Sequence, residues 1–211
     1  MSIISNSLKR IKPSPTIMVT QKAIELKAAG KDVIGLSMGE PDFDTPDNIK
    51  RAAIDAINRG ETKYTSVDGT LTLKKAIVEK FKNENNLNYL PEQISVGTGG
   101  KQVIFNAIVA TVNPDDEVII PAPYWVSYPD IVLLAGGIPR IIKSSEKNKF
   151  KITPNELEKN ITNKTKWIII NSPSNPTGAC YTQKELEALG EILIKNKNIF
   201  ILSDDIYEHI I

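Results

Sequence analysis

Short apolar segments alternate with longer amphipathic segments over the second half of the chain. The apolar segments predict buried strands, and the segments with an apolar residue every three or four positions predict helices. We expect strands at 94–97, 117–120, 167–170 and 200–202, and helices at about 101–112, beyond 125 through 134, and 182–196. Because wholly apolar strands are covered on both faces, this half predicts a mostly parallel sheet between two layers of helices.

The first half of the chain predicts helices that are joined by connections rich in glycine and proline. Helices are expected at about 15–29, 46–59 and 71–85, and a short strand at 33–37. Gly30 is suited to end the first helix, and Thr45 before Pro46 has the composition of an N-cap followed by proline at the first helical position. Capping boxes mark two later helix starts: Thr153 with Glu156, and Thr182 with Glu185.

Composition excludes several classes of function. Of 211 residues, 41% are hydrophobic and 24% charged, which is ordinary for a globular protein of one large or two unequal domains. The net charge of +1 provides no field to attract nucleic acid or an anionic membrane. A single cysteine, Cys180, excludes an internal disulfide. With no signal-peptide pattern, and with the apolar stretch 131–138 far too short to span a bilayer, we expect a cytoplasmic protein.

Residues with distinctive chemistry follow the carboxyl ends of the predicted strands. Since open α/β sheets bind ligands at that edge, these loops are expected to meet at one pocket. The loop Gly97–Lys101 matches neither a Walker A nor a dinucleotide pattern, because Ser95 and Gln102 occupy required positions. The loop still opens a helix, where free N–H groups favour a phosphate. A tight turn without a ligand is the alternative.

The other loops carry an aromatic ring, an amide and an acid. Trp125 is either a core residue or a flat face on which a ring stacks. Asn175 lies in a turn at the surface or presents an amide donor to a ligand. Asp204 is a helix cap or surface acid, or it faces one ligand together with Tyr207, three residues later, whereas adjacent Asp205 is expected to point away.

Six segments, spread over nearly the whole chain, carry a common pattern: 39–46, 63–69, 99–102, 123–128, 171–178 and 203–207. Together and in this order, they resemble the fold-type I, pyridoxal-phosphate-dependent aminotransferases, specifically the class I aspartate aminotransferases. The bacterial subgroup that includes aspartate/prephenate aminotransferases is most similar. Ser174 and Asp205 depart from the usual asparagine and glutamate, at positions not expected to touch the cofactor.

The resemblance implies an α/β fold whose large domain has three layers, αβα, around a mostly parallel sheet. Residues 1–45 would form an N-terminal arm and a segment of the small domain, and residues 46–211 an incomplete first part of the large domain. Tyr64 would reach the cofactor phosphate of a neighbouring subunit, which implies a homodimer. Family use also leads us to expect cis peptide bonds at Ala122–Pro123 and Asn175–Pro176.

The resemblance also assigns cofactor and substrate contacts. Trp125 would stack on the pyridine ring, Asp204 would keep the ring nitrogen protonated, and Asn175 and Tyr207 would hydrogen-bond the phenolic oxygen. The cofactor phosphate would be held by the backbone of Gly99, Gly100 and Lys101. The amino-acid and 2-oxo-acid substrates would meet Gly39, Trp125, Asn175 and, near the entrance, Lys12.

No catalytic residue is expected within the chain. The family's Schiff-base lysine and an arginine for the substrate carboxylate both belong beyond Ile211, and Lys101 is poorly placed as a substitute. We therefore expect an aspartate aminotransferase-like sequence, transferring an amino group from L-aspartate to 2-oxoglutarate, that is inactive as these residues alone. The alternatives are a non-catalytic remnant or binding module, an aromatic or prephenate aminotransferase, or a carbon–sulfur lyase of the same fold.

Overall fold

A computed structural model describes residues 3–36, 39 and 43–210 of the chain, which divide between two units. The first, here called the sheet unit, is drawn from Met1–Ser14 and Gly100–Ile211. The second, the helical unit, is drawn from Pro15–Gly99. The division of the chain at residue 45 stays a prediction.

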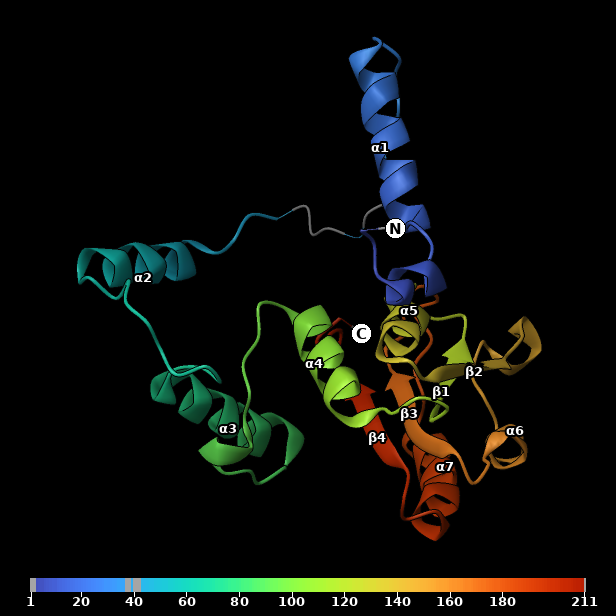
Figure 1. Cartoon of the computed structure of the whole chain (residues 1–211). Coiled ribbons are helices and arrows are strands. Elements are labelled where there is room, and N and C mark those ends of the chain that lie inside the picture. Colours follow the sequence, from blue (N-terminus) through green and yellow to red (C-terminus); the bar gives the residue numbers. More distant parts are fainter. Residues whose placement is uncertain (1–2, 37–38, 40–42, 211) are drawn as a thin grey trace. The chain divides into compact units, whose positions relative to one another are not determined.

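Four parallel strands form the centre of the sheet unit (Figure 1). Their order across the sheet is β2-β1-β3-β4, and every neighbouring pair is parallel. The strands are β1 (Glu117–Ala122), β2 (Ile138–Lys143), β3 (Thr165–Asn171) and β4 (Phe200–Asp204). The strands expected at 117–120, 167–170 and 200–202 are confirmed. The sequence did not predict β2, because it is an edge strand that contains Pro139 and charged residues.

Helices cover both faces of this sheet. One face carries α4 (Gly100–Thr111) and α5 (Ser127–Ala135), and the other carries α6 (Pro154–Asn160) and α7 (Gln183–Lys195). Along β1, Val118 and Ile120 pack with the first pair of helices, whereas Ile119 packs with the second pair. Along β3, Ile169 packs with α4 and α5, and Ile168 packs with α6 and α7. The three-layer αβα arrangement is confirmed.

Local signals in the sequence place the helix starts of this unit. The hydroxyl oxygens of Thr153 and Thr182 accept hydrogen bonds from the backbone N–H groups of Glu156 and Glu185, each at 3.3 Å. Both glutamates bond back to the threonine N–H groups, so both capping boxes are confirmed. Two short 3-10 helices lie at η1 (Asn6–Arg10) and η3 (Glu146–Asn148).

The helical unit consists of α1 (Pro15–Ala28), α2 (Asp47–Asn58), α3 (Leu71–Asn85) and the 3-10 turn η2 (Pro91–Gln93). The three expected helices are confirmed within two residues. Gly30 follows α1 with φ of 78°, the left-handed conformation expected after a helix end. Pro46 occupies the cap position of α2 with ψ of 142° and no side-chain bond, so Thr45 is not the N-cap.

Two predicted strands are wrong. Residues 33–36 and 94–97 have no strand structure, and Ser37 lies outside the described residues. The described part of the helical unit contains no strand with which either segment could pair. A hydrogen bond of 3.0 Å from the Val96 N–H to the Asp68 carbonyl fixes the second segment instead, and Ile94 is buried. In residues 94–97, the apolar content therefore indicates burial and not strand pairing.

None of the described helices combines the length and the apolar character that a membrane crossing requires.

Candidate active site

The strand order places the point at which the connections diverge between β1 and β3. The chain leaves β1 through α5, on one face of the sheet, to reach β2, and it leaves β3 through α7, on the opposite face, to reach β4 (Figure 1). In open α/β sheets, ligands bind at the carboxyl ends of the strands where the connections diverge in this way. Trp125 follows β1, Asn175 follows β3, and Asp204 ends β4.

The loops at this edge contain cis prolines. The bonds Ala122–Pro123 and Asn175–Pro176 are cis, as expected, and Ser172–Pro173 is a third cis bond that was not expected. The Ser144 hydroxyl donates a hydrogen bond of 2.5 Å to the Ala122 carbonyl, which ties the end of β1 to the segment after β2.

Trp125 is partly buried, and other groups contact its ring. Its ring meets the Tyr128 ring edge to face, with centroids 5.4 Å apart. The Lys101 ammonium lies over the Trp125 ring, 4.9 Å from the centroid. The Trp125 side chain therefore packs against the buried core cluster, and the Lys101 ammonium contacts its ring from outside that cluster.

Asp204 is held by a tyrosine that the sequence reasoning did not select. The Tyr128 hydroxyl donates a hydrogen bond of 2.5 Å to Oδ2 of Asp204, and the Ile206 N–H lies 3.4 Å from Oδ1. Burial, and then the bond to Asp204 with its negative charge, raise the pKa of Tyr128 far above its usual range. The hydroxyl therefore keeps its proton and acts as a donor to the carboxylate.

Asn171, at the end of β3, connects the loops that carry the other site residues. Its Nδ2 donates to the Asp204 carbonyl at 2.8 Å, and its Oδ1 accepts from the Asn175 N–H at 2.7 Å. The Asn175 side-chain amide in turn donates to the Tyr207 hydroxyl at 3.3 Å. Asp204, Asn175 and Tyr207 thus belong to one hydrogen-bonded group. Neither Asn171 nor Tyr128 was predicted as a site residue.

The start of α4 leaves open space where a phosphate was expected. Gly99 has φ of 89°, which favours glycine, and α4 begins at the next residue, Gly100. A Cβ added at either glycine would meet no heavy atom within 4 Å. The N-terminus of a twelve-residue helix with open space before it can attract an anion.

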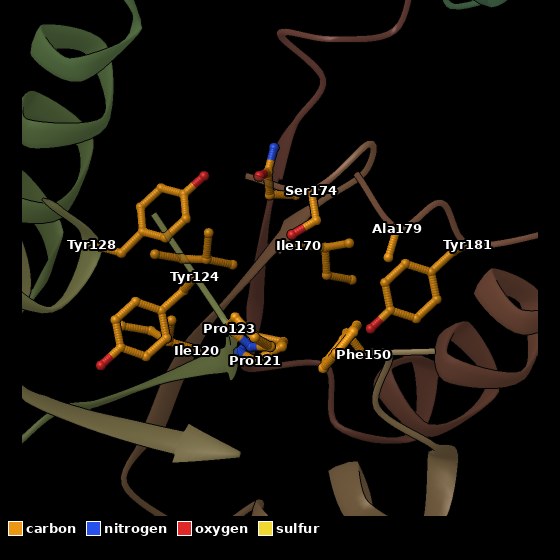
Figure 2. A pocket seen from close by; sticks show the side chains of 12 residues that line it. Ile120, Pro121, Pro123, Tyr124, Tyr128, Phe150, Ile170, Ser174, Ala179 and Tyr181 are labelled. Atoms are coloured by element: carbon orange, nitrogen blue, oxygen red, sulfur yellow. The ribbon is translucent and has the colours of Figure 1, made fainter. Parts of the chain in front are cut away.

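A small hollow, lined in part by Tyr128 and Asn171, lies at the ends of β1 and β3. In Figure 2, Tyr124 and Tyr128 lie on one side of it and Phe150 and Tyr181 on the other, with Pro123 between them. Its volume is about 20 Å³, so it holds about one water molecule. A cofactor or substrate would therefore lie against the loops and not inside this hollow.

Three further residues were predicted as site residues. Gly39 and Tyr64 belong to the helical unit, where both are exposed. Lys12 is an exposed residue of the sheet unit. Their roles stay predictions.

A buried lysine anchors the far end of the loop that carries Asn175. The Lys151 ammonium donates to the Glu185 carboxylate at 2.6 Å and to the Cys180 carbonyl at 3.2 Å. The bond from the Lys151 ammonium, followed by the bond from the Thr182 N–H, lowers the pKa of Glu185 to about 2 from an ordinary 4.5. The ion pair joins the segment after β2 to the start of α7.

Acid should therefore weaken the sheet unit partly through Glu185. A carboxylate with a lowered folded-state pKa contributes stability that is complete above about pH 4.5 and is lost as the pH falls toward 2. Urea unfolding at pH 6 and pH 3, followed by tryptophan fluorescence, should show a smaller loss of unfolding free energy in Glu185→Gln than in the unchanged chain. Glu187→Gln, on the exposed face of the same helix, is the control. Equal pH dependence in Glu185→Gln and the unchanged chain would contradict the assignment.

Curated relatives match the chain along its whole length. The aspartate/prephenate aminotransferase of Cereibacter sphaeroides is 63% identical over 211 residues, which are 100% of this chain and 53% of that protein. The probable aspartate/prephenate aminotransferase of Rhizobium leguminosarum is 62% identical over 210 residues and is covered to 52%. The chain thus spans about half the length of these relatives.

Solved structures agree with the fold. The aspartate aminotransferase of Rhizobium meliloti superposes with a TM-score of 0.96 at 47% identity, covering 100% of this chain and 53% of that one. The Thermus thermophilus aspartate aminotransferase with maleate gives 0.93 at 42% identity, covering 96% and 53%. The family model described as aminotransferase class I and II matches residues 31–211. By fold, by the residues at its strand ends and by this match, the chain belongs to the class I and II aminotransferases.

Proposed function

We propose that the chain carries the cofactor-binding loops of an enzyme that transfers an amino group from L-aspartate to 2-oxoglutarate. The observation that carries the proposal is the hydrogen-bonded group at the strand ends, with the Asp204 carboxylate fixed by Tyr128 beside Trp125. Families of this class generally depend on pyridoxal phosphate, and the relatives named above are aspartate/prephenate aminotransferases.

The donor set fits this cofactor. The helix start at Gly99, Gly100 and Lys101 has the open space and the N–H groups that suit its phosphate. Trp125 supplies an aromatic face for the pyridine ring, and Asp204 supplies an anion for the ring nitrogen. When bound, the cofactor draws electrons from the Cα atom of an amino acid and so makes its amino group transferable.

In this proposal, the chain's own residues orient the ring and hold its proton. The Asp204 carboxylate would accept a hydrogen bond from the protonated ring nitrogen and so keep that nitrogen charged. Asn175 and Tyr207 direct polar groups toward the phenolic oxygen, and their mutual bond of 3.3 Å keeps them together. The substrate carboxylate is proposed to meet the Gly39 backbone together with Trp125 and Asn175.

Two further contacts are proposed for residues outside the hydrogen-bonded group at the strand ends. Tyr64, a fully exposed phenol, is proposed to reach the phosphate site of a second subunit, so the enzyme would be a homodimer with shared sites. Lys12, also exposed, is proposed to lie near the substrate entrance. Prephenate is a second amino acceptor to test, because the names of the relatives include it.

The test uses a completed protein, which we define as residues 1–211 joined to the part of the Cereibacter sphaeroides relative that the match leaves uncovered. Loaded with pyridoxal phosphate, the completed protein should form oxaloacetate and glutamate from L-aspartate and 2-oxoglutarate. Prephenate, in place of 2-oxoglutarate, tests the second acceptor. A folded dimer that binds the cofactor without turnover would favour a binding module, and elimination of a thiol from a sulfur-containing amino acid would favour a carbon–sulfur lyase.

A further inference from the structure

The hydrogen bond from Tyr128 to Asp204 has no role of its own in the proposed function. Tyr128, a residue of α5, is only 2% exposed and belongs to the core cluster between the sheet and the helices α4 and α5. Its hydroxyl nevertheless reaches across the sheet edge to Asp204, 76 positions later in the chain. A buried hydroxyl needs a partner, but a backbone carbonyl would satisfy it equally well. Here the partner is the carboxylate at the end of β4.

A partly buried tyrosine, Tyr181, provides a comparison with a purely structural role. The Tyr181 hydroxyl accepts a hydrogen bond of 3.0 Å from the Ile152 N–H and so closes a contact between two loops. Tyr128 differs because its hydroxyl donates to an ionisable side chain and its ring touches Trp125 edge to face. One side chain therefore contacts both the Trp125 ring and the Asp204 carboxylate of the candidate site.

We propose that Tyr128 is a positioning residue that fixes the Asp204 carboxylate for the pyridine nitrogen, an inference that rests on the proposed function. By donating to Oδ2, the hydroxyl selects one orientation of the carboxylate before the cofactor binds. A preorganised acid needs no rearrangement when charge develops on the ring. Because burial and the neighbouring carboxylate keep the phenol protonated, Tyr128 does not compete for the ring proton.

Removal of the Tyr128 hydroxyl should leave the Asp204 carboxylate in place but allow it more than one orientation. In the completed protein, Tyr128→Phe should lower kcat about tenfold and change KM little, because the lost hydrogen bond involves a charged acceptor. The 15N chemical shift of bound 15N-labelled pyridoxal phosphate, measured near neutral pH, should move part of the way from the protonated toward the unprotonated value. A merely structural role would leave that shift unchanged.

Two variants give the scale for this measurement. Asp204→Asn should bring the 15N shift to the unprotonated value, and Tyr181→Phe, the same change at a partly buried phenol, should leave it at the protonated value. If Asp204→Asn moves the shift and Tyr128→Phe does not, the inference on Tyr128 is overturned and the proposed function stands. If neither the unchanged protein nor any variant holds a protonated ring, the proposed role of Asp204 fails together with the inference.

A cofactor-free measurement covers the case in which Tyr128→Phe does not fold. In residues 1–211 with labelled tyrosine, the hydroxyl proton of Tyr128 should give a downfield, slowly exchanging resonance because the group is buried and bonded to an anion. Asp204→Ala should abolish this resonance, and Asp205→Ala should keep it. Its absence from the unchanged chain, or its survival in Asp204→Ala, would overturn the inference.

Discussion

Replacement of Asp204 by alanine in the completed protein should reduce kcat for aspartate and 2-oxoglutarate about 10²- to 10³-fold. Among the described residues, this carboxylate is the one acid of the hydrogen-bonded group at the strand ends, and it accepts a hydrogen bond from the Tyr128 hydroxyl. Removal of a preorganised charged partner from the reacting centre has effects of this order. Steady-state kinetics with saturating cofactor measure the loss. Near-normal turnover would contradict the assignment of Asp204.

The stability of the same variant should fall much less than its activity. Asp204→Ala leaves the buried Tyr128 hydroxyl without its acceptor, which costs about 1–3 kcal/mol. The double variant Tyr128→Phe/Asp204→Ala removes both partners and should regain most of that free energy while staying inactive. Asp205→Ala is the matched control, because Asp205 is exposed and accepts a hydrogen bond from the Ser203 hydroxyl.

The fold of the second half was largely predictable because its signals are local. Wholly apolar runs marked the central strands, and the threonine–glutamate pairs marked two helix starts. The failures have a common cause. An edge strand such as β2 needs little apolar content, whereas Ile94 is buried without belonging to any strand. Strand formation depends on a neighbouring strand, and a single apolar run does not specify that neighbour.

The candidate site was predictable only in part. Trp125, Asn175 and Asp204 stand out because distinctive residue types follow strand ends, and the sheet topology brings those ends to one edge. Tyr128 fits the apolar pattern of a helix, so no local signal reveals that its hydroxyl meets an acid 76 residues away. Asn171 was hidden in the same manner, since its two partners lie on different loops.

The largest loss of stability should come from Ile168→Ala in residues 1–211. Ile168 is fully buried in β3, among the side chains between the sheet and the helices α6 and α7. Loss of its side chain removes transfer free energy and leaves a cavity, which costs about 2–5 kcal/mol. Urea unfolding followed by fluorescence measures this loss in the sheet unit alone, because both tryptophans, Trp125 and Trp167, lie in that unit.

The register of the sheet supplies the control for this prediction. Ile201 in β4 is the direct partner of Ile168, yet its side chain is 52% exposed. Ile201→Ala deletes the same atoms from the neighbouring strand, so it should cost only about 1 kcal/mol or less. Equal losses in the two variants would mean that β4 is as deeply buried as β3. A changed dependence on urea concentration would instead indicate an altered native or denatured state. A difference of several-fold, with that dependence unchanged, follows from the burial of β3 between two helical layers.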